Sequence, residues 1–125
     1  MYKGDGLKAR EGNDSWKARI DRLEENVKAV RGWSDEETVR FLALSLCGEA
    51  GELANEIKKV WRKGGYSKLT NVEIMALNKR IAFEIADCRM ILYRIAQNLE
   101  IDEDTSCDEK LDGFITRPEN REFDT

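Results

Sequence analysis

Two stretches of this chain carry acidic side chains on the helix face where an amphipathic helix normally places apolar ones. The first is the run GEAGELANEIKK, with Glu49, Glu52 and Glu56, and the second is IAFEIADCRM, with Glu84 and Asp87. At about 100° per residue, Glu49, Glu56 and Glu84 project among apolar side chains, and the other two project at the edges of those arcs. Buried carboxylates are costly unless a cation neutralises them. The pattern therefore favours two facing helices that enclose an acidic pocket.

Each of the two stretches contains a pair of acidic residues with the same spacing. Glu49 and Glu52 are three positions apart, and so are Glu84 and Asp87, which puts each pair on one side of its helix. Oxygen ligands alone select hard divalent cations, so we expect these four residues to bind Mg²⁺, with Mn²⁺ as a substitute. Glu56, one turn further on, is expected to be an additional ligand or to support the ligands. The alternative is a solvated face with ordinary ion pairs, which is what Glu-rich helices usually form.

Helix start and stop signals predict an all-α fold with three long helices and one short helix. Capping boxes at Ser34–Glu37 and Thr70–Glu73 open the two longest helices. Asn13 or Asp14 is expected to cap the first helix. The expected helix ranges are about 14–31, 35–63 and 71–99, with a shorter fourth helix that ends at 113. The predicted domain covers 14–117, and 1–13 and 118–125 are expected to be tails.

Composition narrows the classes of function. The net charge is −4, which argues against general nucleic-acid binding, and no apolar run is long enough to cross a membrane. There is no histidine, so Ser-His-Asp triads, Cys-His pairs and histidine-containing zinc sites are excluded. The three cysteines are odd in number and lack CxxC spacing, which favours a reduced, cytoplasmic setting.

The two longest predicted helices are long for a domain of 125 residues. One chain of this size would have difficulty covering both faces of each helix with its own side chains. We therefore expect the chain to self-associate into a helical bundle as a homo-oligomer.

The two acidic motifs resemble those of a known family. The run LALSLCGEAGELANEIKK and the later run EIADCRMILYRIA are similar to the MazG-like all-α nucleoside triphosphate pyrophosphohydrolases, whose hallmark is ExxE on one helix and ExxD on the next. The resemblance covers about 33–117. It implies Mg²⁺ ligands at Glu49, Glu52, Glu84 and Asp87, a homodimer or a tetramer built from dimers, and hydrolysis of a (deoxy)nucleoside triphosphate to the monophosphate and pyrophosphate. It also implies a role in nucleotide-pool control.

The residues suit this chemistry. Cleavage between the α and β phosphates needs charge neutralisation and a positioned water more than covalent help. We expect Glu52 to be the base or the group that orients the water, because it lies at the rim of the acidic stripe. Two alternatives are a phosphoribosyl-ATP pyrophosphohydrolase of the same fold and a non-catalytic helical module that binds nucleotide or mediates protein association.

Basic and aromatic residues supply candidate contacts for the rest of a nucleotide. Phosphate contacts are expected from basic residues after the acidic run and near the C-terminus, namely Lys59, Arg62, Lys63, Lys110 and Arg117. Lys110 and Arg117 match a K-x6-R spacing of related enzymes, although Phe114 stands where those enzymes usually have Asn. Trp33 and Trp61 are candidates for base stacking. Basic residues in the last turn of a helix also simply complement its dipole, and Trp33 equally suits a hydrophobic staple.

Overall fold

The structure is a computed structural model that describes residues 15–119, and all of its regular structure is helical. This confirms the predicted all-α class. The elements in chain order are α2 (Trp16–Arg31), α3 (Asp35–Arg62), the short 3₁₀ helix η1 (Tyr66–Lys68), α4 (Asn71–Asn98) and α5 (Glu103–Ile115). The predicted tail 1–13 and most of the predicted tail 118–125 lie outside the described residues. No helix within 15–119 combines the length and the apolar character needed to cross a bilayer.

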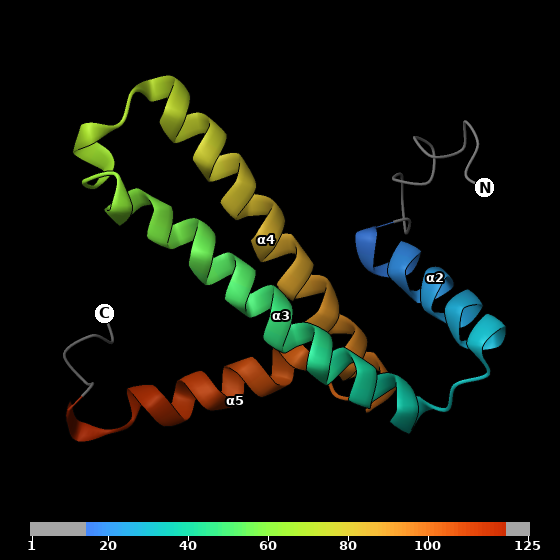
Figure 1. The fold of residues 1–125 in the computed structure, drawn as a ribbon. Helices are drawn as coiled ribbons and strands as arrows, with labels where there is room; N and C mark the ends of the chain where they lie inside the picture. Colours follow the sequence, from blue (N-terminus) through green and yellow to red (C-terminus); the bar gives the residue numbers. More distant parts are fainter. Residues whose placement is uncertain (1–14, 120–125) are drawn as a thin grey trace.

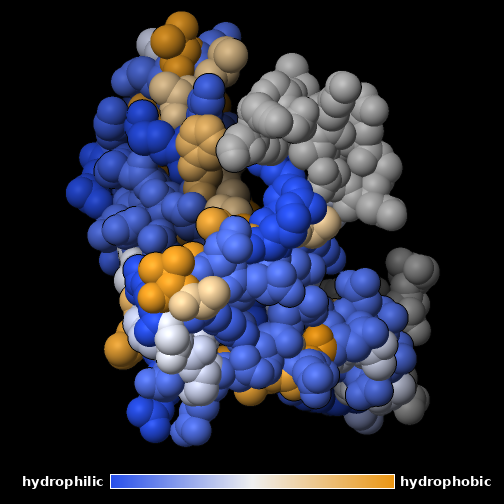
Figure 2. All heavy atoms as spheres, turned by 90° about the vertical axis from the view of Figure 1, so that its right-hand side faces the viewer, coloured by the Kyte–Doolittle hydropathy of each residue, from blue (hydrophilic) through white to orange (hydrophobic). Residues whose placement is uncertain are grey.

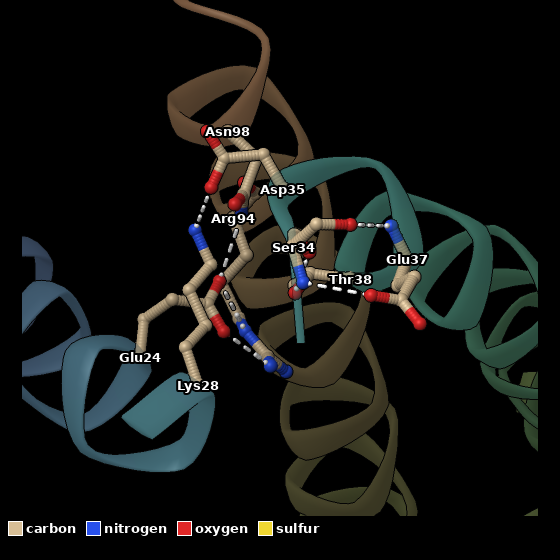
Figure 3. Close-up of polar contacts among 8 residues, drawn as sticks. All are labelled: Glu24, Lys28, Ser34, Asp35, Glu37, Thr38, Arg94 and Asn98. Carbon is tan, nitrogen blue, oxygen red and sulfur yellow. Dashed lines mark hydrogen bonds and ion pairs between the residues drawn. The ribbon is translucent and has the colours of Figure 1, made fainter. Parts of the chain in front are cut away.

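The helix starts follow the capping signals in the sequence. The Ser34 hydroxyl accepts from the Glu37 N–H at 3.1 Å, and the Glu37 carboxylate accepts from the Ser34 N–H at 2.9 Å (Figure 3). Thr70 and Glu73 form the same reciprocal box at the start of α4. Both predicted capping boxes are therefore confirmed. Helix α2 is capped by Ser15, whose hydroxyl accepts from the Ala18 N–H. The predicted cap at 13 or 14, two positions outside the described residues, was therefore wrong, and the helix begins slightly later.

Helices α3 and α4 form a long antiparallel hairpin, and α2 lies beside the C-terminal half of α4 (Figure 1). The turn of the hairpin uses Gly64 and Gly65, whose φ angles of 95° and 92° disfavour other residues. A Cβ at Gly64 would also lie 2.9 Å from Lys68 Cγ. Helix α5 leads away from the end of α4 (Figure 1), and Arg89 of α4 pairs with Glu103 at its start.

The hydrophobic core is small. The buried apolar side chains within 15–119 are Leu42, Val60, Leu77, Ile91, Tyr93 and Ala96. Many apolar side chains on the same helices remain exposed, such as Leu44 at 75% on α3 and Val72 at 77% and Met75 at 73% on α4. Figure 2 shows such side chains reaching the surface in separate patches among polar ones. The hairpin therefore buries one narrow seam and leaves other apolar faces uncovered.

Candidate metal centre

Facing turns of α3 and α4 bring three of the predicted ligands together. Glu49 and Glu52 come from α3 and Glu84 comes from α4, and one carboxylate oxygen of each lies within 4.8 Å of the other two. Ligands on opposite sides of an octahedral Mg²⁺ are about 4.2 Å apart, from bond lengths of about 2.1 Å. The three oxygens are thus close to the spacing that one shared cation requires. We call these three residues the acidic site.

Two of these carboxylates have an oxygen that is buried and unpartnered. Glu49 Oε2 and Glu84 Oε2 have no hydrogen-bond donor, and the only other buried side-chain atom in this state within 15–119 is Asn98 Oδ1. A neutral amide oxygen is far cheaper to leave unpaired than a carboxylate oxygen. The acidic site therefore offers oxygen ligands alone, a donor set that would suit Mg²⁺ or Mn²⁺.

The electrostatics of the acidic site agree with its geometry. Burial raises the pKa of Glu49, and the neighbouring charges of Glu52, Asp87 and Glu84 raise it further. Burial likewise raises the pKa of Glu84, followed by the charges of Glu52 and Asp87. Each carboxylate is therefore harder to ionise than usual, because burial and the neighbouring negative charges both disfavour its charged form. A bound divalent cation would reverse this effect.

Asp87 lies beside the acidic site but outside its closest set. It is half-buried, and its charge acts on both Glu49 and Glu84, yet it is not among the residues that share the 4.8 Å spacing. Cys88 adjoins the same charges. Burial raises the pKa of the Cys88 thiol, and Glu49, Glu84 and Asp87 raise it further, so this thiol stays protonated at neutral pH.

Glu56 is neutralised by the protein itself. Its side chain is only 10% exposed, and it forms ion pairs with Lys59 on its own helix and with Arg80 of α4, the latter at 2.9 Å. The Lys59 hydrogen bond holds the pKa of Glu56 below its usual value despite burial. Because both carboxylate oxygens already have cationic partners, Glu56 fits the supporting role better than that of an additional ligand.

Three of the predicted phosphate-binding residues lie at the C-terminal end of α3, and the other two lie on or just after α5. Lys59 and Lys63 line a pocket at the loop end of the hairpin, whereas Arg62 is exposed and does not line that pocket. Lys110 lies on α5, and Arg117 follows α5 with its guanidinium 5.8 Å from the centre of the Phe114 ring. The Phe114 ring thus contacts Arg117, the second basic residue of the K-x6-R spacing.

The two predicted stacking tryptophans have different surroundings. Trp33 is half-buried, with its ring centre 5.1 Å from that of Phe41 and with the Arg31 guanidinium 4.7 Å away. A hydrophobic staple would pair Trp33, the residue before the Ser34 cap, with Thr38, the fourth residue of α3. Trp61 is 66% exposed near the loop end of the hairpin, and its ring is open to solvent.

Arg80 is a site residue that sequence reasoning missed. It lies one turn before Glu84 on α4 and carries the ion pair to Glu56 across the hairpin. Its spacing from Glu84 was the available signal, because residues four apart share a helix face. The partner across the hairpin, however, depends on the register between α3 and α4.

Comparison with protein families, with curated proteins and with solved structures finds no match for this chain. The likeness to MazG-like enzymes therefore rests on the residues of the two acidic motifs alone.

Proposed function

We propose that this chain is a Mg²⁺-dependent nucleoside triphosphate pyrophosphohydrolase of the MazG-like class. Two buried oxygens, Glu49 Oε2 and Glu84 Oε2, are the observation that supports it most. Neither has a hydrogen-bond donor, and both lie in a cluster of carboxylates. A stable interface does not leave two such groups unpaired, because each carries the cost of desolvating an unpaired charge. Glu49, Glu52 and Glu84 would hold the cation, with Asp87 beside them.

The chemistry follows from the exposure of the individual carboxylates. A divalent cation would neutralise the phosphate oxygens of a bound triphosphate. Glu52 is the exposed member of the acidic site, so it can reach a water molecule that the two more buried carboxylates cannot. It would accept a proton from this water as the oxygen adds to the α-phosphorus. The bond from that phosphorus to its bridging oxygen then breaks, and pyrophosphate leaves with the bridging oxygen.

The assembly that we propose is a homo-oligomer, a dimer or a tetramer built from dimers. Phe83 at 62% and Leu92 at 42% are exposed on α4, and Leu111 at 54% is exposed on α5. Exposed apolar faces of this extent favour burial against another protein surface, and a second copy would complete a closed helical bundle. A single species of monomer mass in light scattering at micromolar concentration would contradict this assembly.

The function is tested by product analysis. The purified protein is incubated with Mg²⁺, or with Mn²⁺, and with each common NTP and dNTP separately. We expect nucleoside monophosphate and pyrophosphate from one or a few of them, and no product when EDTA is present. Glu52→Gln should lower turnover by more than about 100-fold, since even residues that only support metal ligands cost 10- to 100-fold. It should keep part of the thermal stabilisation by Mg²⁺, because the charges of Glu49 and Glu84 remain to hold the cation.

Other outcomes would point elsewhere. Release of orthophosphate and nucleoside diphosphate would contradict the bond assignment and leave the metal site standing. Absence of turnover with every nucleotide would contradict the pyrophosphohydrolase proposal for common nucleotides, and phosphoribosyl-ATP would then be the next substrate to try. The exposed apolar faces favour an association module as the second candidate. That candidate predicts no thermal stabilisation by Mg²⁺.

A further inference from the structure

The acidic site continues along the hairpin into a pocket of the opposite charge. This pocket has a volume of about 220 Å³ and is lined by the cations Lys59, Lys63 and Arg80, by Glu73 and by apolar side chains. One water molecule takes roughly 30 Å³ of liquid volume, so the pocket has room for phosphate groups. We call it the basic pocket.

Helix register makes the acidic site and the basic pocket two ends of one seam. On α3, Glu52, Glu56, Lys59 and Lys63 follow one another at intervals of three or four residues and share a face. On α4, Arg80 precedes Glu84 by one turn. Glu56 marks the junction, because it binds Lys59 and Arg80 on one side and its charge acts on Glu84 on the other.

The cations of the basic pocket retain unused donors. Arg80 donates to Glu56 through Nε at 2.9 Å, which leaves the terminal guanidinium nitrogens available. Lys63 Nζ lies 3.8 Å from Glu73 Oε2, which is beyond hydrogen-bond distance. The other oxygen of Glu73 accepts from the Thr70 N–H at 3.0 Å, so this carboxylate is held at the start of α4. Three cations face two carboxylates in this part of the seam, an excess of one positive charge.

We propose that the basic pocket is an anion site and that it takes the diphosphate end of a triphosphate substrate. The identity of the substrate rests on the proposed function, whereas the preference for an anion rests on the pocket alone. From Glu52 to Lys59 the helix rises about 10 Å, and from Glu84 to Arg80 about 6 Å, at 1.5 Å per residue. One extended polyphosphate chain therefore reaches from a cation at the acidic site to the basic pocket.

This placement fixes the direction of the substrate along the hairpin. The diphosphate points toward the Gly64–Gly65 loop, and the nucleoside points toward the N-terminal half of α3. The α-phosphorus then lies over the acidic site, and the departing pyrophosphate remains on the side where Lys59, Lys63 and Arg80 offset its charge. Charge-assisted hydrogen bonds of this kind are the stronger class, and a guanidinium matches phosphate geometry.

The experiment measures binding of inorganic pyrophosphate to the full chain by calorimetry, at low ionic strength and without divalent metal. Wild type is compared with Lys63→Gln and Arg80→Gln, which each remove one positive charge from the basic pocket. Lys58→Gln is the matched control, because Lys58 is exposed on the same helix and does not line the pocket. Circular dichroism establishes that each variant is folded. Lys63→Gln keeps the test valid if Arg80→Gln misfolds, since the ion pair that it removes, between the Lys63 ammonium and Glu73, is long at 3.8 Å.

We expect pyrophosphate to bind wild type and Lys58→Gln within about twofold of each other, and Lys63→Gln and Arg80→Gln about tenfold more weakly. In turnover assays the two pocket variants should also lose inhibition by pyrophosphate and keep inhibition by nucleoside monophosphate. Equal binding by Lys63→Gln and Lys58→Gln, or no binding to wild type at millimolar concentration, would overturn the anion site. Turnover could still be present in that case, so the proposed function would stand. Conversely, the expected binding pattern without any turnover would support the anion site and contradict only the enzyme.

Discussion

Helix α4 packs against α2 and α3, and both interfaces contain carboxylates. These carboxylates are paired at one interface and partly unpaired at the other. Toward α2, Glu24 accepts from Arg94 at 2.7 Å and 3.1 Å and from Asn98 at 3.0 Å (Figure 3). Toward α3, Glu49 and Glu84 each keep a buried oxygen with no donor. The Glu24 carboxylate at the interface with α2 is therefore paired within the protein, whereas Glu49 and Glu84 at the interface with α3 are not.

A shortage of cations in the chain does not explain this difference. Only one turn beyond Glu52, Glu56 has two cationic partners, Lys59 and Arg80. The positions beside Glu49 are instead small, with Gly48 and Ala50 on either side, and no donor within residues 15–119 reaches its buried oxygen. Paired carboxylates indicate an interface that is structural, and unpaired ones are the observation on which the proposed cation site rests.

The largest effect on stability is expected from breaking the α2–α4 pair. Arg94→Met removes the partner of Glu24, whose side chain is 11% exposed, and leaves its charge nearly buried. Loss of one partner of a fully buried pair costs 3–5 kcal/mol, and the 23% exposure of Arg94 reduces this to about 2–3 kcal/mol. Chemical denaturation with unchanged m-values would measure the loss.

The matched control for Arg94→Met is the double variant Glu24→Gln, Arg94→Met. It should regain part of the lost free energy of unfolding, because a neutral amide replaces the stranded charge. If Arg94→Met changed the free energy of unfolding by less than about 0.5 kcal/mol, as surface substitutions do, the interface with α2 could not be called structural.

A second prediction concerns Tyr93, which also belongs to the α2–α4 interface. Its hydroxyl donates to the Asp21 carboxylate at 2.9 Å, and burial together with Asp21 raises the pKa of Tyr93 to about 12 from a usual 10. A pKa that is raised in the folded state stabilises the protein below pH 10, and that contribution is lost as the pH rises from about 10 to 12. Tyr93→Phe should remove this part of the alkaline loss, about 2 kcal/mol.

The measurement for Tyr93 is denaturant unfolding of wild type and Tyr93→Phe at several values between pH 8 and the alkaline limit. At pH 8 the variant is expected to be less stable by about 1 kcal/mol, because a buried hydrogen bond is lost. The gap should shrink or reverse at the alkaline end. A gap that stays constant with pH would mean that Tyr93 ionises equally easily in the folded and unfolded chain.

Local signals in the sequence predicted most of the helices. The reciprocal boxes at Ser34–Glu37 and Thr70–Glu73 involve residues three apart, so each helix start is specified by its own few residues. The same holds for Gly64–Gly65, which follow the end of α3 and begin the hairpin turn. The face shared by Glu49 and Glu52 also follows from spacing alone, and the structure brings both of them together with Glu84.

What the sequence did not predict depends on how separate helices meet. The pairing of Glu56 with Arg80 and of Glu24 with Arg94 requires the register between two helices, and no local pattern contains it. Asp87 shows the same dependence, since its spacing from Glu84 matched that of the other pair and yet the structure leaves it outside the closest set. Apolar stripes likewise predicted which faces could be buried, and not that Leu92 would be left 42% exposed.

The smallest effect on stability gives the sharpest comparison of the two interfaces. A Glu→Gln substitution should raise the melting temperature at one of them and lower it at the other. Without metal, Glu49→Gln should raise the melting temperature at pH 7, since it removes a carboxylate that is crowded by like charges. Glu24→Gln should lower it, because the amide pairs less well with Arg94. With Mg²⁺ added, wild type and Glu24→Gln should both be stabilised, whereas Glu49→Gln should lose that response. Differential scanning calorimetry with EDTA or Mg²⁺ measures all three proteins.

The pH dependence of the Glu49→Gln effect follows from the same crowding. Burial and the neighbouring carboxylates raise the pKa of Glu49 above its ordinary 4.5, so folding favours its protonated form. The stability that this gives wild type is fully present below about pH 4.5 and is lost as the pH rises through the folded-state pKa. The advantage of Glu49→Gln over metal-free wild type should therefore be greatest near neutral pH and disappear toward pH 4.5. If Glu49→Gln instead destabilised the metal-free protein as Glu24→Gln does, Glu49 would have a partner within the protein, and the contrast between the two interfaces of α4 would be lost.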